Sequence, residues 1–298
     1  MVDIINEYAY LVSIPLFIIL IVLELFIGWK TKQQNYQTKD TLMNVSSGVI
    51  YFALSLAAKS MKLFLFFYVY DHFRLFTIDY FIWWTWVVLF FLDDLTFYWG
   101  HRIGHTVSFY WASHVVHHSS KYFNFSTALR KTWTYDLTGH FIFWIWLAIL
   151  GFHPLQIFAI KTLNFIYQYW IHTEKIGKLP KPIEFIFNTP SHHRVHHGSD
   201  LKYLDRNHAG VLIIWDRLFG TFQEEEELPN YGLTSNIKSN SLFEIEFHEW
   251  KSLFIRIKNS NNLITRIKYL LKPPGWSPDK STLTTKELRE KEISQRQH

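Results

Sequence analysis

The chain of 298 residues contains no cysteine, and this absence removes several kinds of site at once. Without thiols there is no disulfide bond, no thiolate zinc site and no cysteine-ligated iron–sulfur cluster. The absence also leaves the redox compartment of the protein undefined. Any metal ion that the protein holds must therefore be bound through nitrogen and oxygen ligands.

Charged side chains are scarce before His172, where apolar and aromatic residues are abundant. Aromatic residues make up 19% of the chain, a share that few soluble domains carry. This asymmetry predicts a membrane-embedded first half and a water-facing second half. The net charge of +5 fits a basic cytosolic face beside anionic lipid headgroups. The sequence has no basic stripe and no known nucleic-acid motif, so nucleic acid is not an expected partner.

Apolar runs predict an all-α fold, a multi-pass membrane helical bundle with a cytosolic helical cap. The runs cover residues 8–29, 42–69, 80–99, 137–152 and 155–171. A span needs about 20 apolar residues, so the first three runs predict full spans. The last two are short, and they predict either two spans or a helical hairpin that enters the membrane only partway. In the second run, Lys59 and Lys62 would snorkel, or the span would end early and continue along the interface.

Lysines in the first loop set the predicted orientation. Lys30, Lys32 and Lys39 lie in this loop, and the positive-inside rule places it in the cytosol. The third span then returns to the cytosolic face just before His101, and the hairpin delivers His172 to that same face. All the histidine-rich segments are thus expected on one side of the membrane.

Histidines gather in short windows at helical spacing, and this is the most specific feature of the chain. Residues three and four apart share one face of a helix, so each set would present its imidazoles together. Thr189 is expected to cap a short helix that begins at Pro190 and stops at Gly198. The spaced histidines are His101 and His105, then His114, His117 and His118, and finally His193, His196 and His197.

Eight imidazoles in three sets suit two metal ions, because one ion takes about four such ligands. Imidazole binds zinc, copper, iron and nickel, so the ligand type does not select the metal. His172 is expected as a ninth ligand, because it lies where the fifth apolar run meets the cytosol. Carboxylates near the site should hold imidazole N–H groups. The residues expected around the ligands are Asp94, Glu174, His192 and His208.

Around these histidines the chain resembles the fatty acid hydroxylase and sterol desaturase superfamily of membrane di-iron oxygenases. The resemblance rests on three boxes in order, at residues 94–105, 114–119 and 193–197. Segments outside the boxes, among them residues 124–130, 169–174, 188–193 and 209–216, resemble the alkylglycerol monooxygenase branch of that superfamily. The resemblance covers roughly residues 90 to 280.

The resemblance implies a catalytic domain at residues 80–222, between N-terminal membrane helices at 1–79 and a cytosolic C-terminal region at 223–298. It also implies two iron ions, O2, a lipid substrate from the bilayer and an external electron donor such as tetrahydrobiopterin. The reaction implied is hydroxylation beside the ether oxygen of a glyceryl ether lipid, followed by cleavage. The membrane would be the bacterial inner membrane or the endoplasmic reticulum.

Two alternatives stay open at this point. A sterol, carotenoid or fatty-acyl desaturase or hydroxylase would use the same iron site with a different pocket. A non-catalytic membrane protein that binds metal or lipid would keep the histidines without oxygen chemistry.

Overall fold

The computed structural model describes residues 2–33, 35–239 and 241–296, and these ranges form helices without any β-strand. The predicted all-α class is therefore confirmed. Two short 3-10 helices are η1 (Phe125–Leu129) and η2 (His140–Trp144). The α-helices of the described ranges are α1 (Val2–Thr31), α2 (Thr38–Ala57), α3 (Lys59–Phe73), α4 (Trp83–Thr106), α5 (Ser108–His118), α6 (Ile145–Leu150), α7 (Pro154–Trp170), α8 (Lys181–Ile186), α9 (Pro190–His196), α10 (Ile214–Leu218), α11 (Leu242–Lys258), α12 (Leu263–Leu271) and α13 (Thr285–Arg296).

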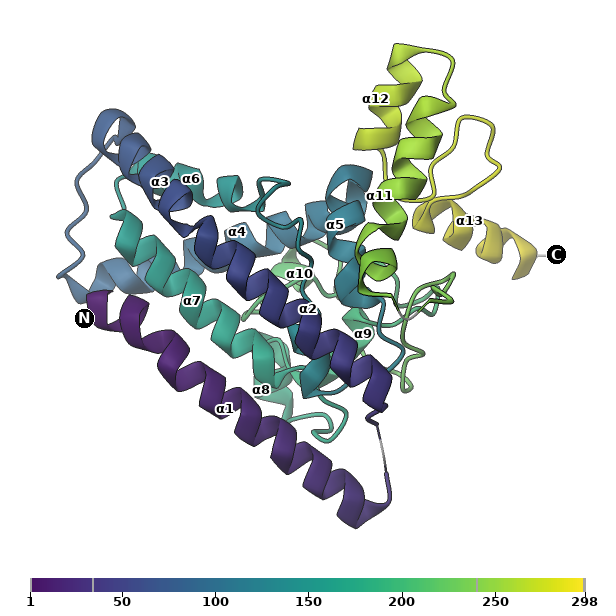
Figure 1. Ribbon diagram of the computed structural model, residues 1–298, viewed down its shortest axis with the longest axis horizontal. Coiled ribbons are helices and arrows are strands. Elements are labelled where there is room, and N and C mark those ends of the chain that lie inside the picture. The colour runs from purple at the N-terminus through teal and green to yellow at the C-terminus, as the bar shows by residue number, and fades with distance from the viewer. Residues whose placement is uncertain (1, 34, 240, 297–298) are drawn as a thin grey trace.

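The helices group into a set of long apolar elements and a set of shorter ones (Figure 1). Helices α1, α2 and α7 run along the same diagonal, and α1 packs against α7. Helix α4 contacts α7 and leads into α5, which packs against α11. The short helix α10 contacts α4, and α9 lies beside α5, with the His196 and His118 ring centroids 4.7 Å apart. Helices α11, α12 and α13 lie on the side away from the N-terminus (Figure 1).

One helix of the described chain is long and apolar enough to cross a membrane by itself, over Leu11–Thr31 of α1. Helices α2 and α3 would form a second crossing only as a broken pair, because they bend by 46° within the second run, where the sequence left open either a full span or one that ends early. Helix α4 begins at Trp83 and continues to Thr106, and it carries the buried carboxylates Asp93 and Asp94. It is not among the candidate spans of the described chain, so the full span predicted from the third run is not shown.

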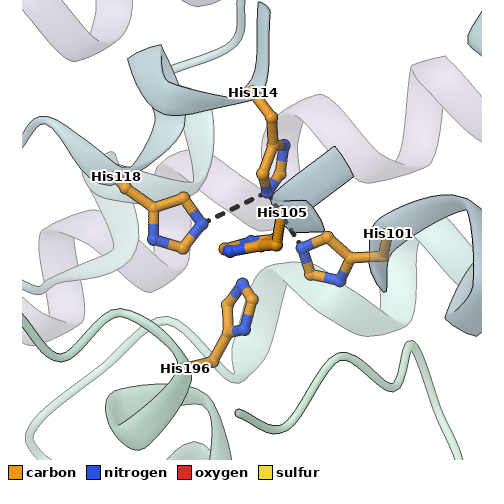
Figure 2. A group of neighbouring side chains, drawn as sticks. All are labelled: His101, His105, His114, His118 and His196. Carbon is orange, nitrogen blue, oxygen red and sulfur yellow. Dashed lines mark hydrogen bonds between the residues drawn. The ribbon is translucent and has the colours of Figure 1, made fainter. Parts of the chain in front are cut away.

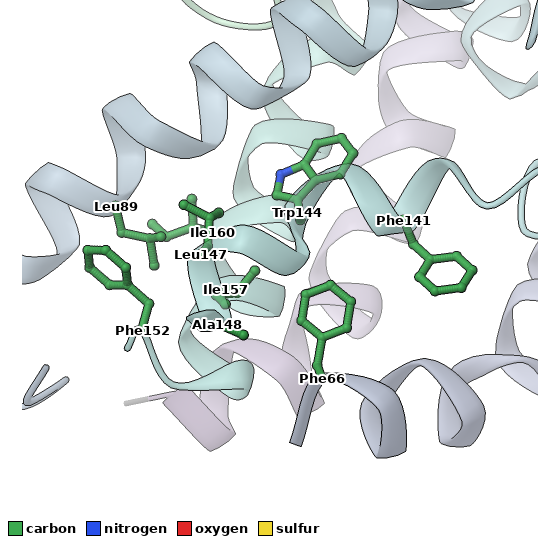
Figure 3. Packing of buried hydrophobic residues seen from close by; sticks show 9 residues of the cluster. All are labelled: Phe66, Leu89, Phe141, Trp144, Leu147, Ala148, Phe152, Ile157 and Ile160. Atoms are coloured by element: carbon green, nitrogen blue, oxygen red, sulfur yellow. The ribbon is translucent and has the colours of Figure 1, made fainter. Parts of the chain in front are cut away.

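The largest apolar core lies between α3, α4, α6 and α7 (Figure 3). Phe66 of α3, Leu89 of α4, Leu147 of α6 and Ile157 of α7 are each almost completely buried there. This core fixes α4 against α7, and those two helices end close to the histidines.

The turn between α6 and α7 requires glycine. Gly151 has φ of +110°, and a Cβ atom there would lie 2.0 Å from the carbonyl oxygen of Phe76. Only glycine adopts this conformation without strain and lets another backbone approach so closely. The predicted hairpin thus turns at Gly151, although η2 and the short α6 replace one continuous first helix.

Two charged side chains are buried among the apolar helices and tie segments together. Lys62 does not snorkel, because its side chain is 9% exposed and its Nζ lies 2.8 Å from Asp136. Glu24 of α1 accepts a hydrogen bond from the Phe125 amide at 2.8 Å and others from the Tyr36 and Thr173 hydroxyls. These contacts attach α1 and α3 to the segments that surround the histidines.

Candidate metal centre

Nine histidines converge into two groups, whose possible ligand atoms lie within 4.8 Å of one another inside each group; all nine are buried except His101 and His114, which are partly buried. The first group has five members, which Figure 2 shows turned toward a common centre. The second group has four members. The first contains His101, His105, His114, His118 and His196, and the second contains His117, His172, His193 and His197.

The helices supply histidines to the two groups unequally. Both histidines of α4 enter the first group, as their spacing of four residues allows. Helix α5 is shared, because His114 and His118 face the first group while His117 faces the second. The third set is also shared, with His196 in the first group and His193 in the second. Helices α5 and α9 therefore lie between two neighbouring centres.

Local sequence explains the start and end of α9. Thr189 and His192 form a reciprocal capping box, Pro190 is the first helical residue, and the C-cap His197 is followed by Gly198. These are the cap, start and stop that the sequence predicted, and they are confirmed. The helix is short, but its fixed ends aim its histidines in defined directions.

Backbone carbonyls hold the outer nitrogen of several rings. The Nδ1 atom of His101 lies 2.8 Å from the His208 carbonyl, and that of His196 lies 2.9 Å from the Arg206 carbonyl. In the second group, the Nδ1 atoms of His117 and His172 lie 3.1 and 2.8 Å from the carbonyls of Arg130 and Gln168. A carbonyl accepts only, so each Nδ1 carries the hydrogen and each Nε2 presents a lone pair.

These lone pairs point toward the Nε2 atoms of neighbouring rings, an arrangement that a bound cation would stabilise. The Nε2 atoms of His117 and His172 lie 3.3 Å apart, and those of His172 and His193 lie 2.9 Å apart. In the first group, the Nε2 atoms of His101 and His114 are separated by 2.9 Å. Nitrogens bound to one ion at about 2.1 Å are roughly 3.0 to 3.4 Å apart. The spacing therefore fits metal coordination.

Unpartnered buried nitrogens lead to the same conclusion. The Nε2 atoms of His105, His196 and His197 are buried and have no hydrogen-bond partner in the described chain. Buried polar atoms are nearly always paired, so each one requires an explanation. One metal ion in the first group would provide the missing partner for His105 and His196, and one in the second group would do so for His197.

Burial keeps the imidazoles in the form that binds metal. Burial, together with neighbouring imidazoles, holds the pKa of His114 and of His193 well below the usual value. Burial also lowers the pKa of His172 to about 3. These side chains are neutral at pH 7, and the neutral imidazole is the metal ligand.

The two carboxylates expected to hold imidazoles contact other groups, and this part of the prediction is wrong. Asp94 accepts hydrogen bonds from the amides of Val211 and Leu212 at 2.8 and 2.9 Å and from the Trp215 indole at 2.9 Å. Glu174 accepts from Asn35 at 3.0 Å. Asp94 therefore fixes the loop that follows His208, and Glu174 fixes the chain that follows α1.

The carboxylate that contacts the first group is Asp205. Its Oδ1 lies 3.4 Å from Nδ1 of His105. Burial raises the pKa of Asp205, but the contact with His105, together with Thr285 and Arg289, outweighs burial and lowers it. Arg289 of α13 donates to the carbonyls of Leu201 and Leu204, which fixes the Asp205 loop. Nothing in the spacing of the sequence indicates this contact, because it joins residues 100 positions apart.

His192 and His208 lie beside the groups but belong to neither. His192 turns its Nε2 to the Glu184 carboxylate at 3.0 Å, so it is a neighbour that contacts this carboxylate. The His208 ring centroid lies 5.0 Å from that of His105, and its buried Nδ1 has no partner within the described residues.

Residues 86–221 match the Fatty acid hydroxylase family, and this segment contains all nine grouped histidines. The chain therefore carries a fatty acid hydroxylase domain, as the resemblance predicted. It is homologous to alkylglycerol monooxygenases, with 40% identity over 271 residues to the proteins of Danio rerio and of Homo sapiens. Each alignment covers 90% of this chain and 60% of the relative, so the chain spans about 60% of the length of these proteins.

A more distant relative is named as a hydroxylase of a different lipid. Ornithine lipid hydroxylase OlsE of Rhizobium tropici is 30% identical over 168 residues, which cover 52% of this chain and 47% of that protein. No solved structure is significantly similar to this fold.

Proposed function

We propose that the protein is a membrane monooxygenase that uses two iron ions and O2 to cleave the ether bond of glyceryl ether lipids. The observation that carries the proposal is the convergence of nine imidazoles, seven buried and two partly buried, into two groups within a fatty acid hydroxylase domain. The identity of 40% to alkylglycerol monooxygenases supports a lipid ether as the substrate.

In this proposal, each group of histidines holds one iron ion, and the nine grouped residues are the ligands. Bound iron would supply the activation of O2 that inserts oxygen into an unactivated C–H bond. The protein holds the rings by their Nδ1 atoms, excludes water from them and keeps them neutral. Asp205 orients His105, while His192 and His208 shape the surroundings without binding iron.

The proposed reaction balances if an external reductant donates two electrons. One oxygen atom enters the carbon beside the ether oxygen, and the other leaves as water with two electrons and two protons. The hemiacetal that results breaks its bond to the ether oxygen and gives a fatty aldehyde and a free glycerol hydroxyl. We assign the two electrons to tetrahydrobiopterin, a soluble donor that fits a site on the water-facing side.

The lipid substrate is proposed to enter the site from the bilayer. The protein itself is proposed to cross the membrane with about three helical spans and a partial hairpin. Helix α1 supports this, because its span is mostly exposed and apolar, with Leu11 at 65% exposure and Ile18 at 57%. A water-soluble protein rarely exposes such a surface. The lysine-rich first loop supports a cytosolic position for the histidines. On this basis residues 1–79, 80–222 and 223–298 are proposed as the membrane, catalytic and C-terminal regions.

A second candidate is hydroxylation of a different lipid without cleavage. The similarity to an ornithine lipid hydroxylase favours it, because that relative matches part of the same chain. Both candidates use the same histidines and differ only in the lipid pocket.

The test is turnover by the purified full-length protein in lipid nanodiscs with iron, O2 and tetrahydrobiopterin. Alkylglycerol should yield a fatty aldehyde, whereas ornithine lipid and sterol should remain unchanged. His118→Ala is the inactive control, and Lys286→Ala, on the exposed helix α13, is the matched active control. Hydroxylated ornithine lipid with no aldehyde from alkylglycerol would favour the second candidate. The absence of any oxygenated product from a protein loaded with two irons would refute both.

A further inference from the structure

Helices α11 and α12 form a hairpin with a large exposed apolar surface outside the fatty acid hydroxylase domain. On α12 the apolar residues follow helical spacing along one face, with Leu263 at 69% exposure, Ile264 at 67% and Leu271 at 61%. Phe243 and Phe254 of α11 are exposed to 69% and 65%. We call the three α12 residues, with Ile267, the hairpin surface.

The same segment is strongly basic. Between residues 251 and 272 the chain contains no aspartate and no glutamate. Within the described residues only Arg256 of this segment makes an ion pair, with Glu249 at 2.6 Å. The cations of the segment are Lys251, Arg256, Lys258, Arg266, Lys268 and Lys272.

The hairpin projects away from the bundle beside α5 (Figure 1). Both helices contact α5, which carries three of the grouped histidines. The apolar and basic residues of the hairpin therefore lie on a projecting part of the molecule, next to the helix that carries these histidines.

We propose that the hairpin surface docks on the anionic cytosolic leaflet as an interfacial membrane anchor. Leucine and isoleucine side chains enter the acyl boundary, and lysine and arginine bind the phosphates and carboxylates of the headgroups. A protein partner is less suited to the surface, because interface cores are depleted of lysine. The anchor holds α5, and with it the histidines, against the membrane. This inference does not depend on which lipid the protein oxidises.

The absence of cysteine permits a direct test on the full-length protein. A spin label at Ile264→Cys reports the hairpin surface, and one at Ile293→Cys, on α13 and 57% exposed, is the matched control. The protein is placed in phosphatidylcholine bilayers with and without phosphatidylserine. With phosphatidylserine, the label at 264 should collide several-fold more with O2 than with a water-soluble nickel chelate. The control label should show the opposite preference.

A second variant tests the role of charge. Replacing Lys258, Arg266 and Lys268 by glutamine should move the label at 264 toward water in membranes that contain phosphatidylserine. A label at 264 that meets the nickel chelate as readily as the control overturns the anchor. A label shielded from both reagents also overturns it, because a protein partner or a second copy would then cover the surface. If the three glutamine substitutions leave the depth of the label at 264 unchanged, the proposed contact between the basic residues and the headgroups is overturned.

Discussion

Replacing Asp205 by asparagine should weaken metal binding at the first histidine group and leave the second unchanged. Asp205 Oδ1 is 3.4 Å from the outer nitrogen of His105, whose inner nitrogen is buried without a partner. Asparagine keeps the shape of the side chain and tolerates the φ of +52° at this position. The substitution therefore removes the negative charge without disturbing the loop.

The size of the effect follows from the geometry. Loss of a partner that holds a metal-bound histidine costs about 10- to 100-fold in metal affinity. The distance of 3.4 Å is longer than an ordinary hydrogen bond, and the Asp205 side chain is 29% exposed. Both facts favour the lower end, about tenfold or ~1.4 kcal/mol.

Competition with a chelator on the purified protein would measure the affinity of each site. Asp200→Asn is the matched control, because Asp200 lies in the same loop and binds Asn230 at 2.7 Å rather than a histidine. Affinity unchanged in Asp205→Asn, or equally reduced in the control, would refute the role given to this carboxylate.

Three further predictions concern the framework of the site. Thr189→Ala should cost about 1 kcal/mol of unfolding free energy, seen as a lower melting temperature, because α9 loses its capping side chain. Lys62→Met should cost ~3–5 kcal/mol by leaving Asp136 unpaired, and a double variant that also carries Asp136→Leu should recover most of the melting temperature. Burial raises the pKa of Glu184, but hydrogen bonds, with that from His192 first, outweigh burial and lower it to about 2. The stability from Glu184 is therefore complete above its unfolded pKa of 4.5 and is lost as the pH falls from there toward 2, so melting temperatures over this range should fall less in Glu184→Gln.

Features set by neighbouring residues could be predicted from the sequence. The cap at Thr189 and the shared helix faces depend on spacings of three or four residues, and the structure reproduces them. The division of the histidines could not be predicted in this way. His114 and His117 lie on one helical face, yet they turn to different groups because other helices approach that face from two sides.

The misassigned carboxylates show where spacing misleads. Asp94 precedes His101 by two helical turns, a rise of about 10 Å, so its short side chain cannot reach that ring. Two backbone amides from a distant loop bind it instead. Asp205 could not be predicted because it is far from His105 in the sequence. Its position depends on the fold of a loop that α13 holds in place.

Metal stoichiometry tests the central claim most directly. Metal analysis of the purified protein should find two irons per chain. His118→Ala and His197→Ala should each retain about one, because each removes a ligand from a different group. Their difference absorbance or Mössbauer spectra should show the loss of opposite sites. One iron or none in a folded, iron-supplied protein, or two irons in both variants, would contradict the proposal of two separate histidine-bound centres.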